Sequence, residues 1–268
     1  MNEITELRTQ KKIIKRYKRL LKVILLTIDK EFKGLDVYLI DILMINRLCK
    51  KINKLIDDFY IEQMSMILLE ININIGRNYL FLGDLADIEL TKPTRELINK
   101  ILINKNTGYS LLHEIKKNKI ALKKGIKSKI MRNIITDRSM QSVNRDIRDL
   151  VYNKVYGRTV GDAAKVLRTF RTEYTRTRTL AKLYASEELQ KQGFKVVKTW
   201  DYTYESRRPR PRHLAANGMM ADEKGYFTFY SEGHGNVKTQ GPGLFGIASE
   251  DINCRCDTEY LVIDGPIL

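Results

Sequence analysis

The sequence predicts an α+β protein, with a basic, mostly helical N-terminal region followed by a small C-terminal domain of helices and antiparallel strands. Apolar residues recur at helical spacing through the first 135 residues, where Pro93 is the only proline. Glycine and proline are concentrated between residues 204 and 250, and short β-type segments lie beside and within that stretch. We place the boundary at Asp137-Arg138-Ser139, which gives regions 1–138 and 139–268.

The first predicted helix is amphipathic and basic. Its apolar stripe consists of Ile14, Tyr17, Leu21, Ile24 and Ile28. The stripe packs on neighbouring helices, follows nucleic acid or a partner protein, or lies on a membrane surface, and periodicity alone leaves all three open. The candidate residues for contact with nucleic acid or a partner protein, in this helix and in the basic segment 116–132, are Lys11, Lys12, Lys15, Arg16, Lys18, Arg19, Lys22, Lys123, Lys124 and Lys127.

The remainder of the N-terminal region also has a helical pattern. An apolar stretch from Leu55 to Leu85 predicts the core of this region, and Gly83 and Pro93 predict turns or helix ends. The segment from Lys116 to Arg132 is a solvated helix face by default, and a second basic segment in the same region favours DNA contact.

The charge is unevenly distributed. Residues 1–150 contain 30 Lys and Arg against 18 Asp and Glu, whereas residues 151–268 contain 18 against 14. This balance fits an anionic partner, since cations release counterions from phosphates, but it also fits an ordinary soluble basic protein. Three cysteines do not resemble a secreted disulfide framework, and Val23 to Leu26 is too short to span a bilayer, so we expect synthesis in a reducing cytoplasm and no membrane partner.

Two helices are predicted to begin the C-terminal region. The first covers 140–156 and ends at Gly157, because glycine readily adopts the left-handed conformation after a helix. The second begins with a capping box formed by Thr159 and Asp162 and ends at Gly193. Its apolar stripe is Val160, Ala163, Leu167, Phe170, Tyr174, Ala181 and Tyr184.

Three strands are predicted after these helices. Phe194 to Thr203 alternates and contains Trp200, Tyr226 to Tyr230 is short and aromatic, and Asp257 to Ile263 closes the fold.

Two polar groups of the C-terminal region invite a structural or a binding role. Glu173 and Arg176 are i, i+3 neighbours on the second helix and are able to pair, within a polar set that includes Arg171 and Arg178. The loop after the first strand presents arginines between prolines, either as an internal network or as a display for carboxylates or phosphates. The predicted structural polar network is Arg171, Glu173, Glu205, Arg207, Arg210 and His213.

Cysteine and histidine residues raise a metal-site hypothesis. Cys254, Cys256, His213 and His234 would complete a tetrahedral zinc site, whereas the spacing of one residue between the cysteines is unusual for structural zinc and also fits two apolar side chains at a strand start. A Cys–His nucleophile is a third interpretation. The sequence contains no phosphate-binding Gly-rich loop, no His-Glu-x-x-His pair and no Gly-x-Ser-x-Gly elbow, so no catalytic residues and no cofactor other than this zinc are predicted.

The order of several short motifs resembles the phage Mu F-like minor head protein family, the head-morphogenesis proteins of tailed bacteriophages. The resemblance covers about residues 140–268, and Glu205 stands where the family usually has Asp. Its motifs are Gly157, Arg171-Thr172-Glu173, Gly193, Trp200, Glu205, Arg207, Arg210, His213, Gly218 and Asn253-Cys254-Arg255-Cys256.

The resemblance implies a non-enzymatic minor capsid protein in the virion, bound in several copies to the portal protein at the portal vertex inside the head. It would assist capsid assembly and genome packaging or ejection, and the basic N-terminal region would contact the double-stranded DNA genome without sequence preference. The alternative hypothesis is a metal-dependent effector or nuclease that uses His213, Cys254 and Cys256.

Overall fold

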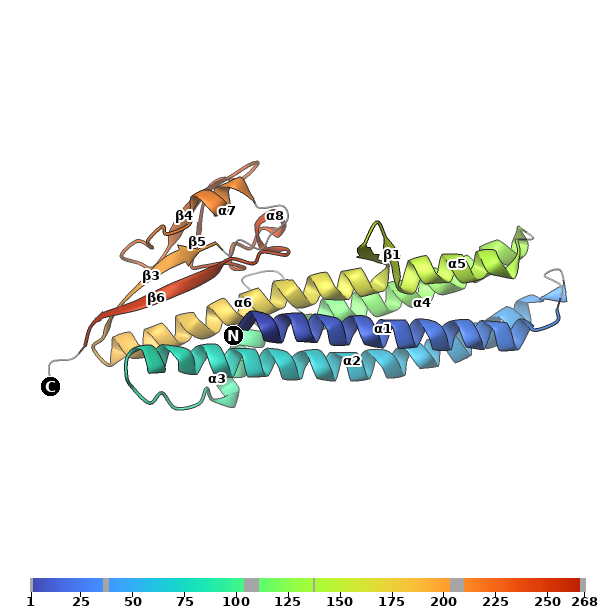
Figure 1. Cartoon of the computed structure of the whole chain (residues 1–268), viewed down its shortest axis with the longest axis horizontal. Coiled ribbons are helices and arrows are strands. Elements are labelled where there is room, and N and C mark those ends of the chain that lie inside the picture. The colour runs from blue at the N-terminus through green and yellow to red at the C-terminus, as the bar shows by residue number, and fades with distance from the viewer. Residues whose placement is uncertain (1, 36–38, 104–110, 137, 203–209, 266–268) are drawn as a thin grey trace. The chain divides into compact units, whose positions relative to one another are not determined.

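A computed structural model describes residues 2–35, 39–103, 111–136, 138–202 and 210–265. Long helices dominate and the strands are confined to the C-terminal half, so the predicted α+β class is confirmed (Figure 1). The chain forms two compact units, each built from two stretches: unit 1 is 1–68 with 112–168, and unit 2 is 69–111 with 169–268. The predicted boundary between residues 138 and 139 divides the chain into two continuous regions, which is a different division from these units, and it stays a prediction.

Unit 1 is a helical bundle with a small hairpin. An Arg16–Glu62 ion pair joins the first helix to the second, and Lys123–Asp57 joins the second to the fourth. Its elements are α1 (Asn2–Phe32), the first part of α2 (Ile42–Leu85), α4 (Leu111–Ile135), α5 (Met140–Val151), β1 (Asn153–Val155), β2 (Arg158–Val160) and the start of α6 (Asp162–Lys191).

The predicted helix at the N-terminus is confirmed, but its buried stripe is rotated from the prediction. Ile13 and Leu20 are buried, whereas Ile14 and Leu21 are only half-buried. Each is next to an apolar neighbour, so periodicity could not decide between the two members of each pair. The shared members of the stripe, Tyr17, Ile24 and Ile28, are fully buried.

The predicted helix over 140–156 is too long. It ends at Val151, and the next residues form the β1–β2 hairpin instead. Tyr156 and Gly157 occupy the two turn positions with φ of 47° and 73°, the pattern of a type I′ turn, so Gly157 turns a hairpin and does not end a helix. The predicted capping box is also wrong, because Thr159 pairs with Lys154 in this hairpin.

Unit 2 combines the end of α2 and about three-quarters of α6 with small antiparallel sheets. The three predicted strands are present, β6 pairs with β3, and β4 pairs with a strand, β5, that was not predicted. Further elements are α3 (Arg95–Ile103), β3 (Lys195–Asp201), α7 (Pro211–Ala215), β4 (Phe227–Ser231), β5 (Gly235–Thr239), α8 (Ala248–Asp251) and β6 (Asp257–Asp264).

The strands enclose an aromatic core centred on Trp200, which is 1% exposed. Phe227 and Phe229 alternate inward from β4, and their rings lie 5.4 and 4.7 Å from the Trp200 ring. Cys254 and Cys256 belong to the same buried cluster. The core therefore brings the two C-terminal cysteines next to the aromatic side chains of the sheet.

Candidate metal centre and basic helix face

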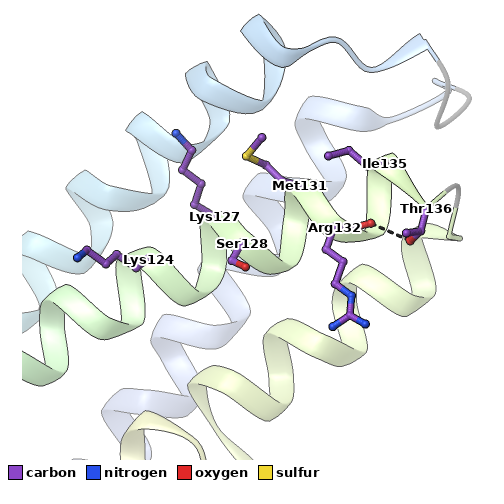
Figure 2. A pocket seen from close by; sticks show the side chains of 7 residues that line it. All are labelled: Lys124, Lys127, Ser128, Met131, Arg132, Ile135 and Thr136. Atoms are coloured by element: carbon purple, nitrogen blue, oxygen red, sulfur yellow. Dashed lines mark hydrogen bonds between the residues drawn. The ribbon is translucent and has the colours of Figure 1, made fainter.

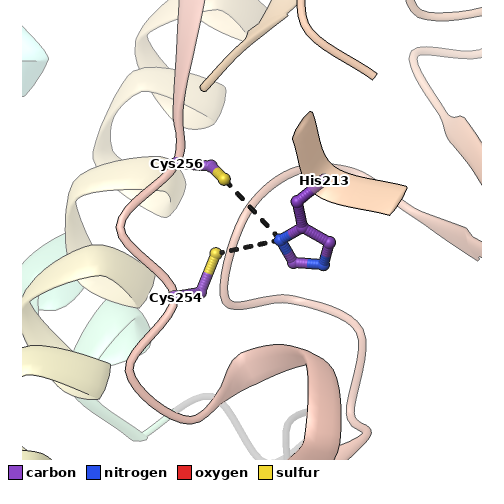
Figure 3. A group of neighbouring side chains, drawn as sticks. All are labelled: His213, Cys254 and Cys256. Atoms are coloured by element: carbon purple, nitrogen blue, oxygen red, sulfur yellow. Dashed lines mark hydrogen bonds between the residues drawn. The ribbon is translucent and has the colours of Figure 1, made fainter. Parts of the chain in front are cut away.

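His213, Cys254 and Cys256 meet in the core of unit 2. His213 is held in the short helix α7, which Pro211 begins at a position where proline's missing N–H costs nothing. Its Nδ1 atom lies 3.6 Å from the Sγ atoms of both cysteines, and all three ligand atoms lie within 4.8 Å of one another. Figure 3 shows both sulfur atoms directed at the same imidazole nitrogen.

Glu250 fixes the other side of the imidazole. Its Oε2 atom lies 3.0 Å from His213 Nε2, and its carboxylate also accepts from Arg212 and from Ser231 Oγ. Burial raises the pKa of Glu250, but the bonds from Arg212, Ser231 and His213 outweigh it and leave this pKa below its usual value. An ionised Glu250 accepts from Nε2, so it orients the imidazole with Nδ1 toward the two cysteine sulfurs.

The two cysteines share their protons unequally. The hydrogen bond between the thiol groups lowers the pKa of Cys254 well below its usual value, and the nearby His213 contributes in the same direction against burial. The same bond, together with burial, raises the pKa of Cys256. The pair therefore favours a thiolate at Cys254 and a thiol at Cys256.

Aromatic rings close this site on several sides. The rings of Trp200 and Phe229 lie 5.3 and 5.8 Å from His213, and the Phe245 ring stacks on it at 5.6 Å. His213, Cys254 and Cys256 are at most 3% exposed. No large molecule reaches these atoms in the folded protein.

Helix α6 binds the turn that carries the cysteines. Thr172 Oγ1 accepts the Asn253 N–H at 3.1 Å, Thr175 Oγ1 donates to the Cys254 carbonyl at 2.8 Å, and Arg178 donates to the Cys256 carbonyl at 3.0 Å. These three residues are spaced by three, so they lie along one face of the helix. Two motifs that are 80 residues apart in the sequence thus form one structural unit.

Glu173 and Arg176 form a buried ion pair on the same helix. Arg176 donates Nε and Nη2 to Glu173 Oε2 at 3.0 and 2.7 Å, and its Nη1 to the Ile101 carbonyl at 2.8 Å. Burial raises the pKa of Glu173, and Arg176 opposes the rise without cancelling it. The arrangement anchors α3 to α6 and offers no nucleophile.

The other members of the predicted sets have separate positions. Arg210 donates to the carbonyls of Ser249 and Ile252, both at 2.7 Å, so it holds the α8 segment through backbone carbonyls. His234 is an exposed residue of the β4–β5 turn, outside the group formed by His213, Cys254 and Cys256. Arg171 is half-buried on α6, and Glu205 and Arg207 lie outside the described residues.

Glu250, the partner of His213, was missed in the sequence. The two residues are 37 positions apart, and no spacing rule links a carboxylate in one short helix, α8, to an imidazole in another, α7. A run of two acidic residues just before Asn253 in an otherwise basic chain was the available signal.

The α1 candidates form a cationic face opposite the buried stripe. Six of them, Lys11, Lys12, Lys15, Lys18, Arg19 and Lys22, are exposed. At 100° per residue these six positions fall within about 120° of the helix circumference. Arg16 lies at the edge of this arc and is paired with Glu62 at 2.6 Å, and the Lys18 ammonium lies 5.8 Å from the Tyr152 ring.

The α4 candidates do not converge on one point. Lys123 and Lys119 contact Asp57 at 2.5 and 3.0 Å, and their bonds lower the pKa of Asp57. Lys124 and Lys127 line a shallow hollow with Arg132, and Figure 2 shows the two lysines pointing to one side of α4 and Arg132 to another. The hollow therefore has a basic rim but no focused anion pocket.

Comparison with known proteins agrees with the motifs that meet in unit 2. Residues 124–259, about half of the chain, match the family described as "Phage Mu protein F like protein". The chain belongs to this family. It is a structural family of phage head morphogenesis.

A curated relative shares part of this Mu F-like chain. A stretch of 101 residues is 37% identical to the "NAD(+)--arginine ADP-ribosyltransferase EFV" of Enterococcus faecalis (strain ATCC 700802 / V583). The match covers 38% of this chain and 19% of the relative, so the chain spans about a fifth of that protein's length. No solved structure matches the chain. None of the described helices is long and apolar enough to cross a membrane.

Proposed function

We propose that this Mu F-like chain is a minor capsid protein that binds the portal at its vertex inside the head and contacts the genome through α1. It assists capsid assembly and the packaging or ejection of DNA, and several copies are present in each virion. The cationic face of α1 is the observation that supports DNA contact most directly, because its six side chains lie on one side of a single helix.

The dimensions of this face suit a nucleic-acid backbone. Lys11 and Lys22 are eleven positions apart, which is about 17 Å along a helix axis. DNA carries one phosphate charge for each ~1.7 Å of its axis, so several phosphates lie within reach of the face. Contacts of this kind position a protein on DNA without reading its sequence, which is the behaviour required for a whole packaged genome.

Salt dependence tests the DNA contact. If all six cations contact phosphates, the logarithm of the binding constant falls with the logarithm of salt with a slope of about −5, and affinity falls about 1,000-fold between about 50 and 200 mM salt. Fluorescence anisotropy with two duplexes of unrelated sequence measures both the slope and the absence of sequence preference. Binding that is absent, or that does not change with salt, contradicts the proposal.

Matched variants locate the contact. Lys15→Gln, at the centre of the face, is expected to make the slope shallower by about one unit. Lys195→Gln removes an equally exposed lysine from β3 and serves as the control, with the slope unchanged. An equal loss for both variants assigns binding to net charge and not to α1.

Portal association is tested separately. Quantitative mass spectrometry of purified virions beside isolated portal complexes is expected to find the chain in both, at a few to about a dozen copies for each portal, as a ring-associated component requires. A chain that is abundant in virions and missing from portal complexes would place it elsewhere in the head.

A catalytic role has less support. The hypothesis of a metal-dependent effector or nuclease needs a site that a substrate reaches, whereas His213 and the two cysteines are buried and His234 lies outside their group. The relative named for ADP-ribosyl transfer matches over only 19% of its own length, so its activity is not extended to this chain. We therefore propose that the chain acts by binding.

A further inference from the structure

We propose that His213, Cys254 and Cys256 bind one zinc ion that holds α7 against the turn preceding β6. The inference concerns the integrity of unit 2 and does not depend on the DNA or portal contacts proposed above. It rests on the geometry of three convergent side chains and on the carboxylate behind the histidine.

The distances agree with shared coordination to zinc. Zinc bonds of about 2.3 Å to sulfur and about 2.0 Å to nitrogen, at a tetrahedral angle, separate the two ligand atoms by about 3.5–3.6 Å. The two distances from His213 Nδ1 to the cysteine sulfurs are both 3.6 Å. The three ligand atoms all lie within 4.8 Å of one another, so they are close enough to share one ion.

The histidine is already oriented as a metal ligand would be. Glu250 lies 3.0 Å from Nε2, and Nδ1 faces the two sulfur atoms. Metal-binding histidines commonly donate their other ring nitrogen to a carboxylate in this way. Arg212 and Ser231 Oγ bond the same carboxylate at 2.5 and 2.7 Å, so the orienting group is itself held in place.

Zinc accounts for the composition of the site better than apolar packing does. Packing as small hydrophobic side chains explains two buried cysteines, but it does not explain an imidazole nitrogen that lies 3.6 Å from both of their sulfur atoms. Soft thiolate ligands with one imidazole select zinc over the hard cations magnesium and calcium. The three ligand residues are at most 3% exposed, so no substrate reaches an ion held there and we assign it a structural role.

The site joins segments that are distant in the chain. His213 belongs to α7, and the cysteines lie in the turn that α6 binds through Thr175 and Arg178. An ion at this point cross-links α7 to the α6-bound turn and so covers the Trp200 core from one side. Removing the ion is expected to loosen unit 2 and leave unit 1 folded.

Metal analysis of the full-length chain tests the proposal. Protein purified under reducing conditions and dialysed against metal-free buffer is expected to retain about one zinc ion per chain, because structural zinc sites bind the ion tightly. Replacement by cobalt is expected to give a thiolate-to-cobalt charge-transfer band and strong tetrahedral d–d bands. Cys254→Ser and Cys256→Ser are each expected to lose the zinc and the charge-transfer intensity.

Matched controls separate ligation from folding. Cys49→Ser changes the third buried cysteine, in α2, and His234→Ala changes an exposed histidine of the same unit; both are expected to keep the full zinc content. Glu250→Gln is expected to keep tetrahedral cobalt spectra while lowering zinc affinity about 10- to 100-fold.

The wild-type chain alone is sufficient to overturn the proposal. Zinc below about a tenth of an equivalent, together with no cobalt charge-transfer band, excludes the site under the same reducing conditions. Intact mass then reports the alternative: a loss of two hydrogens shows a Cys254–Cys256 disulfide, and an unchanged mass shows two buried free thiols. Loss of zinc in His234→Ala would also contradict the ligand set.

Discussion

The basic helices of unit 1 and the β-rich core of unit 2 place their charges in opposite ways. On α1 the cations face solvent and the opposite face is apolar, whereas α6 buries Glu173, Arg176 and Lys182 inside unit 2. Surface charges cost little to keep and are available to a partner, but buried charges persist only where a partner is built into the fold. The exposed cations of α1 are thus available to a binding partner of unit 1, whereas the buried charges of α6 stabilise the fold of unit 2.

The largest effect on stability is expected in the aromatic core of unit 2. Trp200→Ala removes the central side chain of the aromatic core and is expected to lower the free energy of unfolding by roughly 3–5 kcal/mol. Trp200 is the only tryptophan, so the variant is followed by circular dichroism in urea and not by fluorescence. A loss below about 1 kcal/mol would mean that the core repacks around the gap.

The buried ion pair should be nearly as sensitive. Glu173→Gln leaves the Arg176 guanidinium buried without its carboxylate and is expected to cost about 3 kcal/mol. Glu188→Gln is the matched control, since Glu188 pairs with Lys191 on the same helix at the same spacing but at the surface. Urea unfolding followed by Trp200 fluorescence compares the two, and equal losses would remove the distinction between buried and exposed charge.

Asp162 is the buried charge of unit 1 and has a smaller, pH-dependent effect. Burial raises its pKa, and the hydroxyl groups of Tyr60 and Tyr17, with the more distant Lys165, reduce the rise without cancelling it. Because the pKa of Asp162 is raised in the folded state, the contribution of Asp162 to the free energy of unfolding is fully present below the unfolded pKa of about 3.9. This contribution is lost as pH rises through the folded pKa.

Asp162→Asn tests this sign directly. Asparagine accepts from both tyrosines but does not ionise, so the variant should gain stability relative to the wild type as pH rises from about 4 to 7, by up to about 1–2 kcal/mol. Circular dichroism in urea at several pH values measures the difference between the two proteins. A difference that does not change with pH would show that Asp162 titrates normally.

The smallest effect is expected at the surface of unit 1. Asp57→Asn breaks the contacts with Lys119 and Lys123 and is expected to cost less than about 1 kcal/mol, because all three side chains are partly exposed. The lowered pKa of Asp57 means that this small contribution is present above the unfolded pKa and is lost in acid. High salt should remove it, and a loss that persists in about 1 M salt would contradict its surface character.

The sequence predicted the elements of secondary structure that have a repeating apolar pattern. It did not predict the elements that depend on a single backbone conformation or on pairing with another strand. Helical periodicity over 30 or more residues predicted α1 and α6, and alternation predicted β3, β4 and β6. The β1–β2 hairpin was missed because Tyr156 has to adopt a positive φ, which its side chain type does not announce. The strand β5 was missed because its sequence, with Gly235 and Asn236, has little β propensity and forms only by pairing with β4.

The candidate site was likewise predicted only in part. The two cysteines and His213 stood out by residue type, but the choice of His213 over His234 depends on where α7 lies. The part of α6 in the family signature stood out as a polar helix, and its binding of the cysteine turn through backbone carbonyls carries no sequence signature. Contacts to backbone are invisible in sequence because every residue provides the same carbonyl.

The pairing of β3 with β6 sets an order for folding. The β4–β5 hairpin closes between neighbouring residues, which takes microseconds, whereas Lys195 has to find Asp264 across about 70 residues of chain. Until β6 arrives, β3 presents an unpaired edge that carries Val196 and Val197. While β3 is unpaired, other copies of the chain are able to add a strand to its edge. We therefore expect aggregation during folding, more than the stability of the folded protein, to limit the yield of soluble protein in the host.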